Sequence, residues 1–329
     1  MKTFDCFLFY NELDLLEIRL NLLYDHIDYF VIVESEVTFQ GQLKDFNFEK
    51  NKKRFEKFID KIFYYKIEKY KFDFTQLPKI ENPKSEDEKL LNSVFEFVEQ
   101  SNEFDKTHYW WGNESYQRES IWRALSNLNP GDADLILLSD ADELINPDIL
   151  MHIKKNIRSN EVYSCKQHEF YYYLNYYHHS NWFGQIAFLL GSFKYTSLNK
   201  LRSLRTASNV VYDLVILENA GWHFTNLGTN KSITEKIKSW GHKEFNNRIV
   251  LSSLNYNIKH GYDIFRRNNF GKLSFINKED ELLEPISKFI STLPKPLIGP
   301  EIQKENVFKK FLFSMYFKLA NRIYNFTTQ

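Results

Sequence analysis

Three carboxylates follow directly after an apolar run near the middle of this 329-residue chain. The run Leu135–Ser139 is followed by Asp140, Asp142 and Glu143. Because side chains alternate along an extended segment, the Asp-x-Asp spacing turns Asp140 and Asp142 to one face, where both can reach one divalent cation. A cation at the carboxyl end of a buried strand can bind a diphosphate, with Asp142 as the first direct ligand and Asp140 as a second ligand or a ribose contact. The simpler alternative is a strand followed by an acidic helix cap.

The balance of charge argues against a nucleic-acid partner. The chain has 43 basic residues (Lys and Arg) and 43 acidic residues (Asp and Glu), so it has no overall positive field. Aromatic residues make up 17% of the chain, which could serve sugar stacking or reflect an AT-rich genome. Cys6 and Cys165 lack a metal-site spacing and predict no disulfide framework.

The apolar stretches are too short for a membrane span. The amino-terminal stretch soon becomes acidic, and no other stretch reaches the roughly 18 uninterrupted apolar residues that a spanning helix needs. We therefore expect a cytoplasmic protein. The tail Phe308–Phe326 mixes basic and apolar residues and predicts an amphipathic helix, which either packs on the domain or contacts the inner face of a membrane as a peripheral anchor.

The amino-terminal part alternates strand and helix patterns, which is typical of a doubly wound α/β domain. Residues 3–10 predict a strand, and Asn11 is expected to cap a helix whose apolar face runs through Leu13–Leu23. Asp28–Glu34 and Ile59–Ile67 predict two further strands.

Beyond these strands we expect an insertion over about residues 68–110, in part helical around Asp87–Gln100, and then a helix over Asn113–Asn127. The remaining elements are predicted as antiparallel strands and then helices: strands over Ser164–Leu174, Ile186–Tyr195 and Val210–Leu217, and helices opening at Asn146-Pro147 and spanning Ser232–Trp240 and Arg248–Tyr256. The expected division is an α/β domain over residues 1–245 and a mainly helical extension over 246–329 that packs on it.

Four segments in order resemble glycosyltransferase family 17, the family of the β-1,4-N-acetylglucosaminyltransferases that add bisecting GlcNAc. The similarity spans roughly residues 4–245 and is carried by these residues: Phe9–Arg19; Asp28–Ser35 with Thr38, Phe39, Gly41 and Lys44; Asn113, Glu114, Gln117 and Arg118 with Ser139–Glu143; and Gly221–Phe224 with Lys236 and His242. Any one of these motifs is weak evidence, but four in register make the resemblance specific.

The resemblance implies a GT-A type, Rossmann-like glycosyltransferase fold with a mixed sheet. It also implies a nucleotide-sugar donor, with UDP-GlcNAc first among the candidates, a glycan acceptor, Mn²⁺ or Mg²⁺, and inversion at the anomeric carbon. The chain departs from the family pattern in the segment Leu144–Pro147, at Thr225, and in its missing amino-terminal membrane anchor. These departures leave open whether the acceptor is a surface polysaccharide, a lipid-linked oligosaccharide or a protein glycan.

Further candidate residues surround the acidic motif. The imidazole of His223 could complete an oxygen and nitrogen ligand set that suits Mn²⁺, or it could be a structural histidine beside Trp222. Arg118 could neutralise a diphosphate, or it could pair with Glu114 four residues earlier on a helix. Residues at the end of the second strand and in the polar loop after it are candidates for donor binding: Glu34, Ser35, Thr38 and Lys44. A plain surface loop explains these residues nearly as well.

Inversion requires a base for the acceptor hydroxyl, usually a carboxylate near the anomeric carbon. Glu169, Asp213 and Glu218 lie in or near apolar strand patterns, and we place Glu218 first among them. The aromatic stretch Phe170–Tyr177 with His178, His179 and Trp182 could form an acceptor platform, but sheet packing is the commoner use of such a stretch.

The leading hypothesis is a metal-dependent inverting glycosyltransferase. A metal-dependent phosphohydrolase could use the same acidic motif, but it usually needs further His or Asp ligands. A carbohydrate-binding protein without catalysis would explain the aromatic residues but not the carboxylates at the end of a buried strand.

Overall fold

The computed structural model describes residues 1–68, 79–100, 109–194, 196–206, 212–239, 245–267, 270–290 and 297–306, together with 308, 311–317, 319 and 320. Parts of the predicted 68–110 insertion and of the predicted tail helix lie outside these residues. So do His242 and the predicted element ends at Tyr195, Val210 and Trp240.

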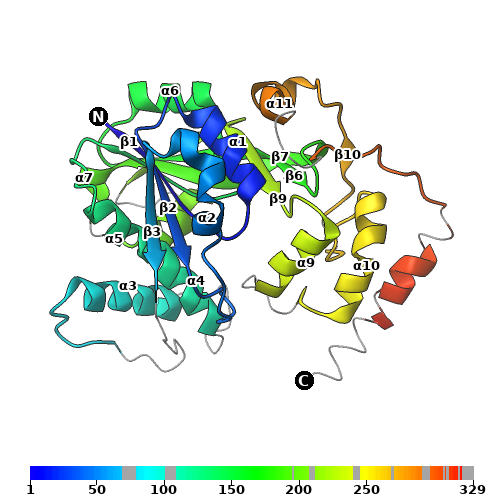
Figure 1. Ribbon diagram of the computed structural model, residues 1–329, viewed down its shortest axis with the longest axis horizontal. Coiled ribbons are helices and arrows are strands. Elements are labelled where there is room, and N and C mark those ends of the chain that lie inside the picture. The colour runs from blue at the N-terminus through cyan, green and yellow to red at the C-terminus, as the bar shows by residue number, and fades with distance from the viewer. Residues whose placement is uncertain are drawn as a thin grey trace.

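Parallel strands form one half of a mixed ten-stranded sheet. These strands lie in the order β3 (Ile62–Ile67), β2 (Tyr29–Ser35), β1 (Thr3–Leu8) and β4 (Leu135–Asp140), all parallel to their neighbours. Helix α1 (Leu13–Leu23) connects β1 to β2. The continuous apolar runs of β1, β2 and β4 suit this position, because helices cover both faces of the sheet (Figure 1). The α/β expectation for this part of the chain is confirmed.

The remaining strands pair in both directions. Strand β7 (Tyr176–Leu189) pairs with β4, and β6 (Glu161–Tyr171) pairs with β7 through several register shifts. The short strands β9 (Gly221–Thr225) and β5 (Glu143–Ile145) complete the path of the sheet. Off this path, β8 (Asp213–Leu217) pairs with β6, and β10 (Ser274–Phe275) pairs with β7.

Each face of the sheet has its own hydrophobic core. One core contains apolar residues of α1, α6 (Pro147–Asn156) and α11 (Glu284–Ile290). The other contains residues of α3 (Glu86–Gln100), α4 (Tyr109–Glu119) and α5 (Ile121–Ser126). The short helices α2 (Asn47–Asn51), α7 (Leu190–Phe193) and α8 (Leu198–Ser203) and the 3-10 helices Lys52–Phe58, Leu204–Thr206 and Glu281–Leu283 fill the connections.

A third core lies at the carboxyl-terminal side of the sheet. Helices α9 (Asn230–Ser239) and α10 (Arg248–Lys259) pack there against tyrosines of the β6–β7 hairpin. A helical segment over residues 311–317 lies beside α10 (Figure 1), and its Phe313 ring stacks on Tyr256 with the centroids 3.8 Å apart.

Three local predictions are wrong. Asn11 does not cap α1: Glu12 occupies the cap position and its side chain makes no cap hydrogen bond to the helix. The strand predicted over Ile186–Tyr195 ends at Leu189, where α7 begins. The strand near Val210–Leu217 was expected to be antiparallel, but β8 pairs parallel with β6, because the chain returns through α8 before it joins the sheet.

Candidate functional site

A cavity of about 430 Å³ lies at the carboxyl ends of β1 and β4. We call it the acidic cavity, because the paired carboxylates Asp140 and Asp142 lie in its wall. Polar lining residues from segments far apart in the sequence include Tyr10, Glu12, Thr38, Lys44, Glu114, Gln117, Arg118, Trp182, Asn199, Arg202, Arg205, His223, Asn226 and Lys236. Four predicted site residues, Arg118, Asp140, Asp142 and His223, thus line this one cavity.

A buried arginine fixes the backbone of the acidic segment. The guanidinium of Arg19, on α1, donates to both carboxylate oxygens of Asp5, at 2.7 and 2.5 Å. It also donates to the carbonyl oxygens of Asp140 (3.1 Å) and Glu143 (2.9 Å) and to Ser139 Oγ (2.6 Å). Arg19 and Asp5 are both fully buried, so the amino-terminal helix and the acidic turn form one hydrogen-bonded unit.

Arginines surround Asp140. Its carboxylate lies 2.7 Å from Arg202 Nη2 and 3.5 Å from Arg118 Nη2, and 39% of its side chain is exposed to the cavity. Burial opposes ionisation of Asp140, but the guanidinium groups of Arg202 and Arg118 outweigh it and hold the pKa of this carboxyl well below its usual range. Asp140 is therefore an anion, and it still has exposed surface for a ligand.

The sequence analysis did not identify two arginines of this cavity, Arg202 and Arg205. Arg202 lies in the last turn of α8 and bridges Asp140 to the fully buried Glu143, at 2.7 Å from each carboxylate. Arg205 follows three residues later and its guanidinium lies 5.8 Å from the Trp182 ring. Within the described residues no carboxylate lies at ion-pair distance from Arg205, and burial, together with the neighbouring Arg202, lowers its pKa to about 10. A partly buried cation without such a partner is suited to bind an anionic ligand.

The second carboxylate of the motif faces a lysine and a histidine. Lys236 Nζ, from α9, donates to Asp142 Oδ2 at 2.8 Å and lies 3.8 Å from Glu12 Oε1. Burial opposes the charged form of Lys236, but Asp142 and Glu12 outweigh it and raise its pKa above the usual range. His223 Nε2 lies 3.8 Å from Asp142 Oδ1, because β5 and β9 pair with Glu143 opposite His223.

The ring of His223 is oriented from two sides. The indole of Trp182 stacks on it with the centroids 4.2 Å apart, and the indole nitrogen donates to Glu143 at 2.9 Å. His223 Nδ1 lies 3.5 Å from Glu169 Oε1, with no hydrogen bond of standard geometry among the described residues. A carboxylate behind one imidazole nitrogen leaves the other nitrogen free to bind a metal, which is the usual arrangement at metal-binding histidines.

These side chains could hold a divalent cation. The 3.8 Å between Asp142 Oδ1 and His223 Nε2 is close to the separation of about 3 Å between adjacent ligands of one ion. Asp140 adds an exposed carboxylate in the same cavity. The carboxylate and imidazole donors suit Mn²⁺ or Mg²⁺, with the nitrogen favouring Mn²⁺.

A second group of ligand-type side chains lies behind His223. Glu169, His178 and His179 each offer one ligand atom, and these atoms lie within 4.8 Å of one another. His178 Nδ1 is 2.7 Å from Glu169, while its Nε2 contacts the Phe270 carbonyl oxygen. Both nitrogens therefore face acceptors, and the pKa of His178 is raised: burial opposes the shift, but the hydrogen bond to Glu169 outweighs it. Glu169 thus contacts both His178 and, at 3.3 Å, His179 Nε2.

Only some of the residues predicted to bind the donor line the acidic cavity. Thr38 and Lys44 line the acidic cavity. Glu34 does not: it is 1% exposed, and four internal donors satisfy its carboxylate, namely Lys44 Nζ (2.5 Å), the Asn47 and Phe48 amides (2.6 and 3.0 Å) and Tyr64 Oη (2.9 Å). Ser35 is also buried, and its hydroxyl accepts from the Val37 amide.

Helix α4 supports this loop from behind. Asn113 donates to the Phe39 carbonyl oxygen at 2.8 Å, and Gln117 donates to that of Val37 at 2.9 Å. Arg118, one residue further, donates to Glu114 at 2.9 Å and to Asn199 at 3.0 Å while it lines the cavity. The helix-surface ion pair and the cavity position of Arg118 thus coexist.

Glu218, the first candidate for the catalytic base, does not line the acidic cavity. Glu218 follows β8, has a side chain 61% exposed and pairs with Lys166 at 3.1 Å. Asp213 is exposed at the other end of β8. The aromatic stretch is used mainly for packing, since Phe170, Tyr171, Tyr172 and Tyr176 are buried, whereas Trp182 lines the cavity.

An α/β sheet with a carboxylate pair and several guanidinium groups at its strand ends is suited to an enzyme that acts on an activated, anionic sugar donor, a glycosyltransferase. The model of glycosyltransferase family 17 matches residues 1–92 of the chain. The matched part covers the segments Phe9–Arg19 and Asp28–Lys44, so the resemblance seen in the sequence is confirmed there. No curated protein matches the chain. The family implies a nucleotide-sugar donor and a sugar-containing acceptor.

Proposed function

We propose that this protein is a family 17 glycosyltransferase with a GT-A type catalytic fold, and that it transfers GlcNAc from UDP-GlcNAc to a glycan acceptor, with inversion and with a bound divalent cation. The observation that carries the proposal is the acidic cavity, in which Asp140 and Asp142 lie at the end of β4 beside Arg118, Arg202 and Arg205. Carboxylates alone would repel a diphosphate. Carboxylates with a bound cation and surrounding guanidinium groups would attract it.

Asp142 and His223 are the proposed metal ligands, and Asp140 is either a third ligand or a contact of the donor ribose. When bound, Mn²⁺ or Mg²⁺ supplies Lewis-acid stabilisation of the leaving diphosphate. Arg118 and Arg205 bind the phosphate oxygens, and Arg205 supports this role because no carboxylate of the described residues pairs with it. Thr38 and Lys44 are placed to bind the nucleoside end of the donor, because they line the same cavity from the loop after β2.

The proposal includes two parts of the chain, a catalytic domain and a helical extension. A catalytic domain over residues 1–245 would carry the acidic cavity. The helices of 246–329 would pack on it, and the third core supports this, because residues of α10 there contact tyrosines of β6 and β7.

The test is the thermal stability of the purified protein with UDP, GDP, CDP and CMP sugars, each with and without Mn²⁺. A ligand at about 100 times its Kd stabilises the folded state by about 2.7 kcal/mol, or roughly 4 °C in Tm for a chain of this length. We expect that shift with UDP-GlcNAc and Mn²⁺ together. Asp142→Asn should abolish it, and Asp148→Asn, an exposed acid in the first turn of α6, should keep it.

The products of turnover separate the alternatives. Release of UDP with transfer of the sugar supports the proposal. Release of inorganic phosphate or sugar phosphate would indicate a phosphohydrolase, and binding without any product would indicate a carbohydrate-binding protein. Absence of a shift with every nucleotide sugar in a folded sample would contradict the proposed donor site.

We also propose that the protein is cytoplasmic and docks peripherally on an anionic membrane surface through its carboxyl-terminal segment. Among the described residues, no helix is long and apolar enough to cross a membrane. Phe313 and Phe317 face the protein, whereas exposed apolar residues recur at the spacing of one helix face: Phe308, Phe311, Leu312, Met315, Tyr316 and Leu319. The same stretch of sequence contains Lys309, Lys310 and Lys318, which adds the basic charge that anionic lipids attract.

A further inference from the structure

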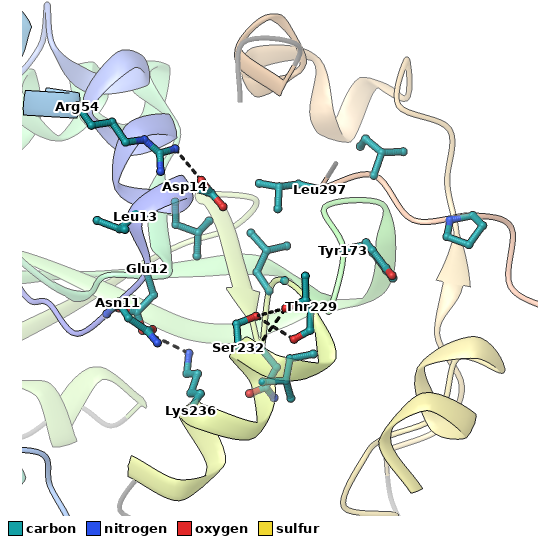
Figure 2. A pocket seen from close by; sticks show the side chains of 17 residues that line it. Asn11, Glu12, Leu13, Asp14, Arg54, Tyr173, Thr229, Ser232, Lys236 and Leu297 are labelled. Atoms are coloured by element: carbon teal, nitrogen blue, oxygen red, sulfur yellow. Dashed lines mark hydrogen bonds and ion pairs between the residues drawn. The ribbon is translucent and has the colours of Figure 1, made fainter. Parts of the chain in front are cut away.

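A second cavity adjoins the acidic cavity. It has a volume of about 380 Å³ and lies between the start of α1, the start of α9 and the segment around Leu297 (Figure 2). We call it the α1–α9 cavity. The two cavities share three lining residues, Glu12, Asn226 and Lys236, so ligands bound in them would meet at these side chains.

The lining of the α1–α9 cavity suits a sugar ring. Asn11, Asp14, Thr229 and Ser232 offer amide, carboxylate and hydroxyl groups, which can hydrogen-bond to sugar hydroxyls. Tyr173 lies across from them (Figure 2) and offers an aromatic surface of the kind on which sugar faces pack. The acidic cavity has a different character, since Arg118, Arg202 and Arg205 line it beside the carboxylates and can bind an anion. We therefore assign the diphosphate to the acidic cavity and a sugar ring to the α1–α9 cavity.

Backbone amides fix one carboxylate oxygen of Glu12, and the other oxygen points toward Lys236, which lines both cavities. Its Oε2 accepts from the backbone amides of Tyr10 (3.2 Å) and Asn11 (3.0 Å). Its Oε1 lies 3.8 Å from Lys236 Nζ, the ammonium that donates to Asp142 at 2.8 Å. The side chain is 14% exposed. A carboxylate with one oxygen tethered by backbone amides keeps its direction and can accept a proton on the other oxygen.

We propose that the α1–α9 cavity binds the acceptor sugar and that Glu12 is the catalytic base. This inference rests on the proposed glycosyl transfer. In that step the acceptor hydroxyl oxygen bonds to the anomeric carbon of the donor, and the bond from that carbon to the diphosphate oxygen breaks. The leaving nucleoside diphosphate keeps the electron pair, and the hydroxyl proton ends on Glu12 Oε1.

The surrounding carboxylates are less suited to this role. Among the described residues, Glu12 is the carboxylate that lines both cavities. Asp14 lines the α1–α9 cavity but lies 2.6 Å from Arg54, and Glu143 is fully buried against Arg202 and Trp182. Glu218 lies outside both cavities. Asp140 and Asp142 face the cations of the acidic cavity.

The test compares wild type with Glu12→Gln, which keeps an oxygen acceptor for the two backbone amides but removes the base. Three quantities are measured. The first is the Mn²⁺-dependent Tm shift with UDP-GlcNAc. The second is the rate of UDP release when water or one of a panel of p-nitrophenyl glycosides accepts the sugar, and the third is that rate with added azide. Removing a general base typically lowers the rate by a factor of about 10² to 10⁴. We expect Glu12→Gln to keep the Tm shift and to lose at least about 100-fold in kcat.

Azide gives a readout that a merely structural role would not produce. It is already an anion and needs no base, so it should restore turnover of Glu12→Gln as the inverted glycosyl azide while barely affecting wild type. Glu86→Gln, a first-turn glutamate of α3 with a side chain 79% exposed, is the matched control and should behave as wild type. Glu12→Asp covers the case in which the glutamine variant does not fold, and should keep a reduced rate because it keeps a carboxylate.

The outcomes separate the two proposals. Full activity of Glu12→Gln with active wild type would overturn the assignment of Glu12 and leave the transferase intact. So would loss of activity in Glu218→Gln without loss in Glu12→Gln. A wild type that neither binds nor turns over nucleotide sugars would overturn the proposed function, and the role of Glu12 with it.

Discussion

Replacing Arg19 by methionine should destabilise the whole protein and not the cavity alone. Methionine fills much of the arginine volume but removes the hydrogen bonds to Asp5, Ser139 and the backbone of the acidic segment. Arg19 and Asp5 are both 0% exposed, so the change leaves a carboxylate buried without its counter-charge. Breaking such a buried pair costs about 3 to 5 kcal/mol. For a chain of this length that corresponds to a fall in Tm of roughly 4 to 7 °C.

Two controls isolate the buried charge as the cause. Arg54→Met removes an arginine that pairs with Asp14 and Glu17 but is 24% exposed, and it should cost less than about 1 kcal/mol. The double variant Asp5→Leu/Arg19→Met removes both charges and should be more stable than Arg19→Met alone by at least about 1 kcal/mol. The assay is chemical unfolding followed by circular dichroism. A loss below about 1 kcal/mol in Arg19→Met, or a double variant no more stable than it, would refute the reasoning.

Two further predictions concern the metal and the membrane. Glu169→Gln should weaken Mn²⁺ binding by about 10- to 100-fold, measured by electron paramagnetic resonance on the protein without donor, because Glu169 orients His223 from 3.5 Å; unchanged affinity would exclude that role. Serine at both Phe311 and Met315 should reduce flotation of the protein with vesicles that contain anionic lipid, since these side chains are 63% and 52% exposed. Met151→Ser, a similarly exposed methionine on α6, is the control, and equal flotation of both variants would contradict a membrane contact through the tail.

The parallel part of the sheet could be predicted largely because β1, β2 and β4 are buried on both faces. Continuous apolar runs such as Leu135–Leu138 are typical of such strands, so these three strands lie where the runs predict them. The edge strand β3 is only partly buried, and it begins at Ile62, after the predicted start at Ile59. The turn after Leu189 could not be predicted in this way, because Leu190–Phe193 continues the apolar pattern and forms α7 instead of more strand. Short apolar runs do not distinguish helix from strand by periodicity.

The candidate site was predictable only where one segment carries several of its residues. Asp140 and Asp142 are two residues apart, so the sequence places them close together, although Asp142 lies in the turn between β4 and β5 and not in the extended segment that the spacing predicted. Arg202 and Arg205 reach the same cavity from more than 60 positions away, through a return of the chain that depends on tertiary packing. Glu34 shows the opposite error: a carboxylate at the end of a strand resembles a ligand contact in the sequence, but here it accepts the first amides of α2.

The amino-terminal motif acts on the acidic cavity through side chains about two helical turns apart. Arg19 donates hydrogen bonds to the carbonyl oxygens of Asp140 and Glu143. Glu12, at the start of the same helix, lies 3.8 Å from Lys236, which donates to Asp142. A shift of α1 would therefore move the backbone of the acidic segment and the proposed base together. Variants within α1 should alter the positions of donor and acceptor jointly, so a loss of turnover there is informative only when nucleotide-sugar binding is measured on the same protein.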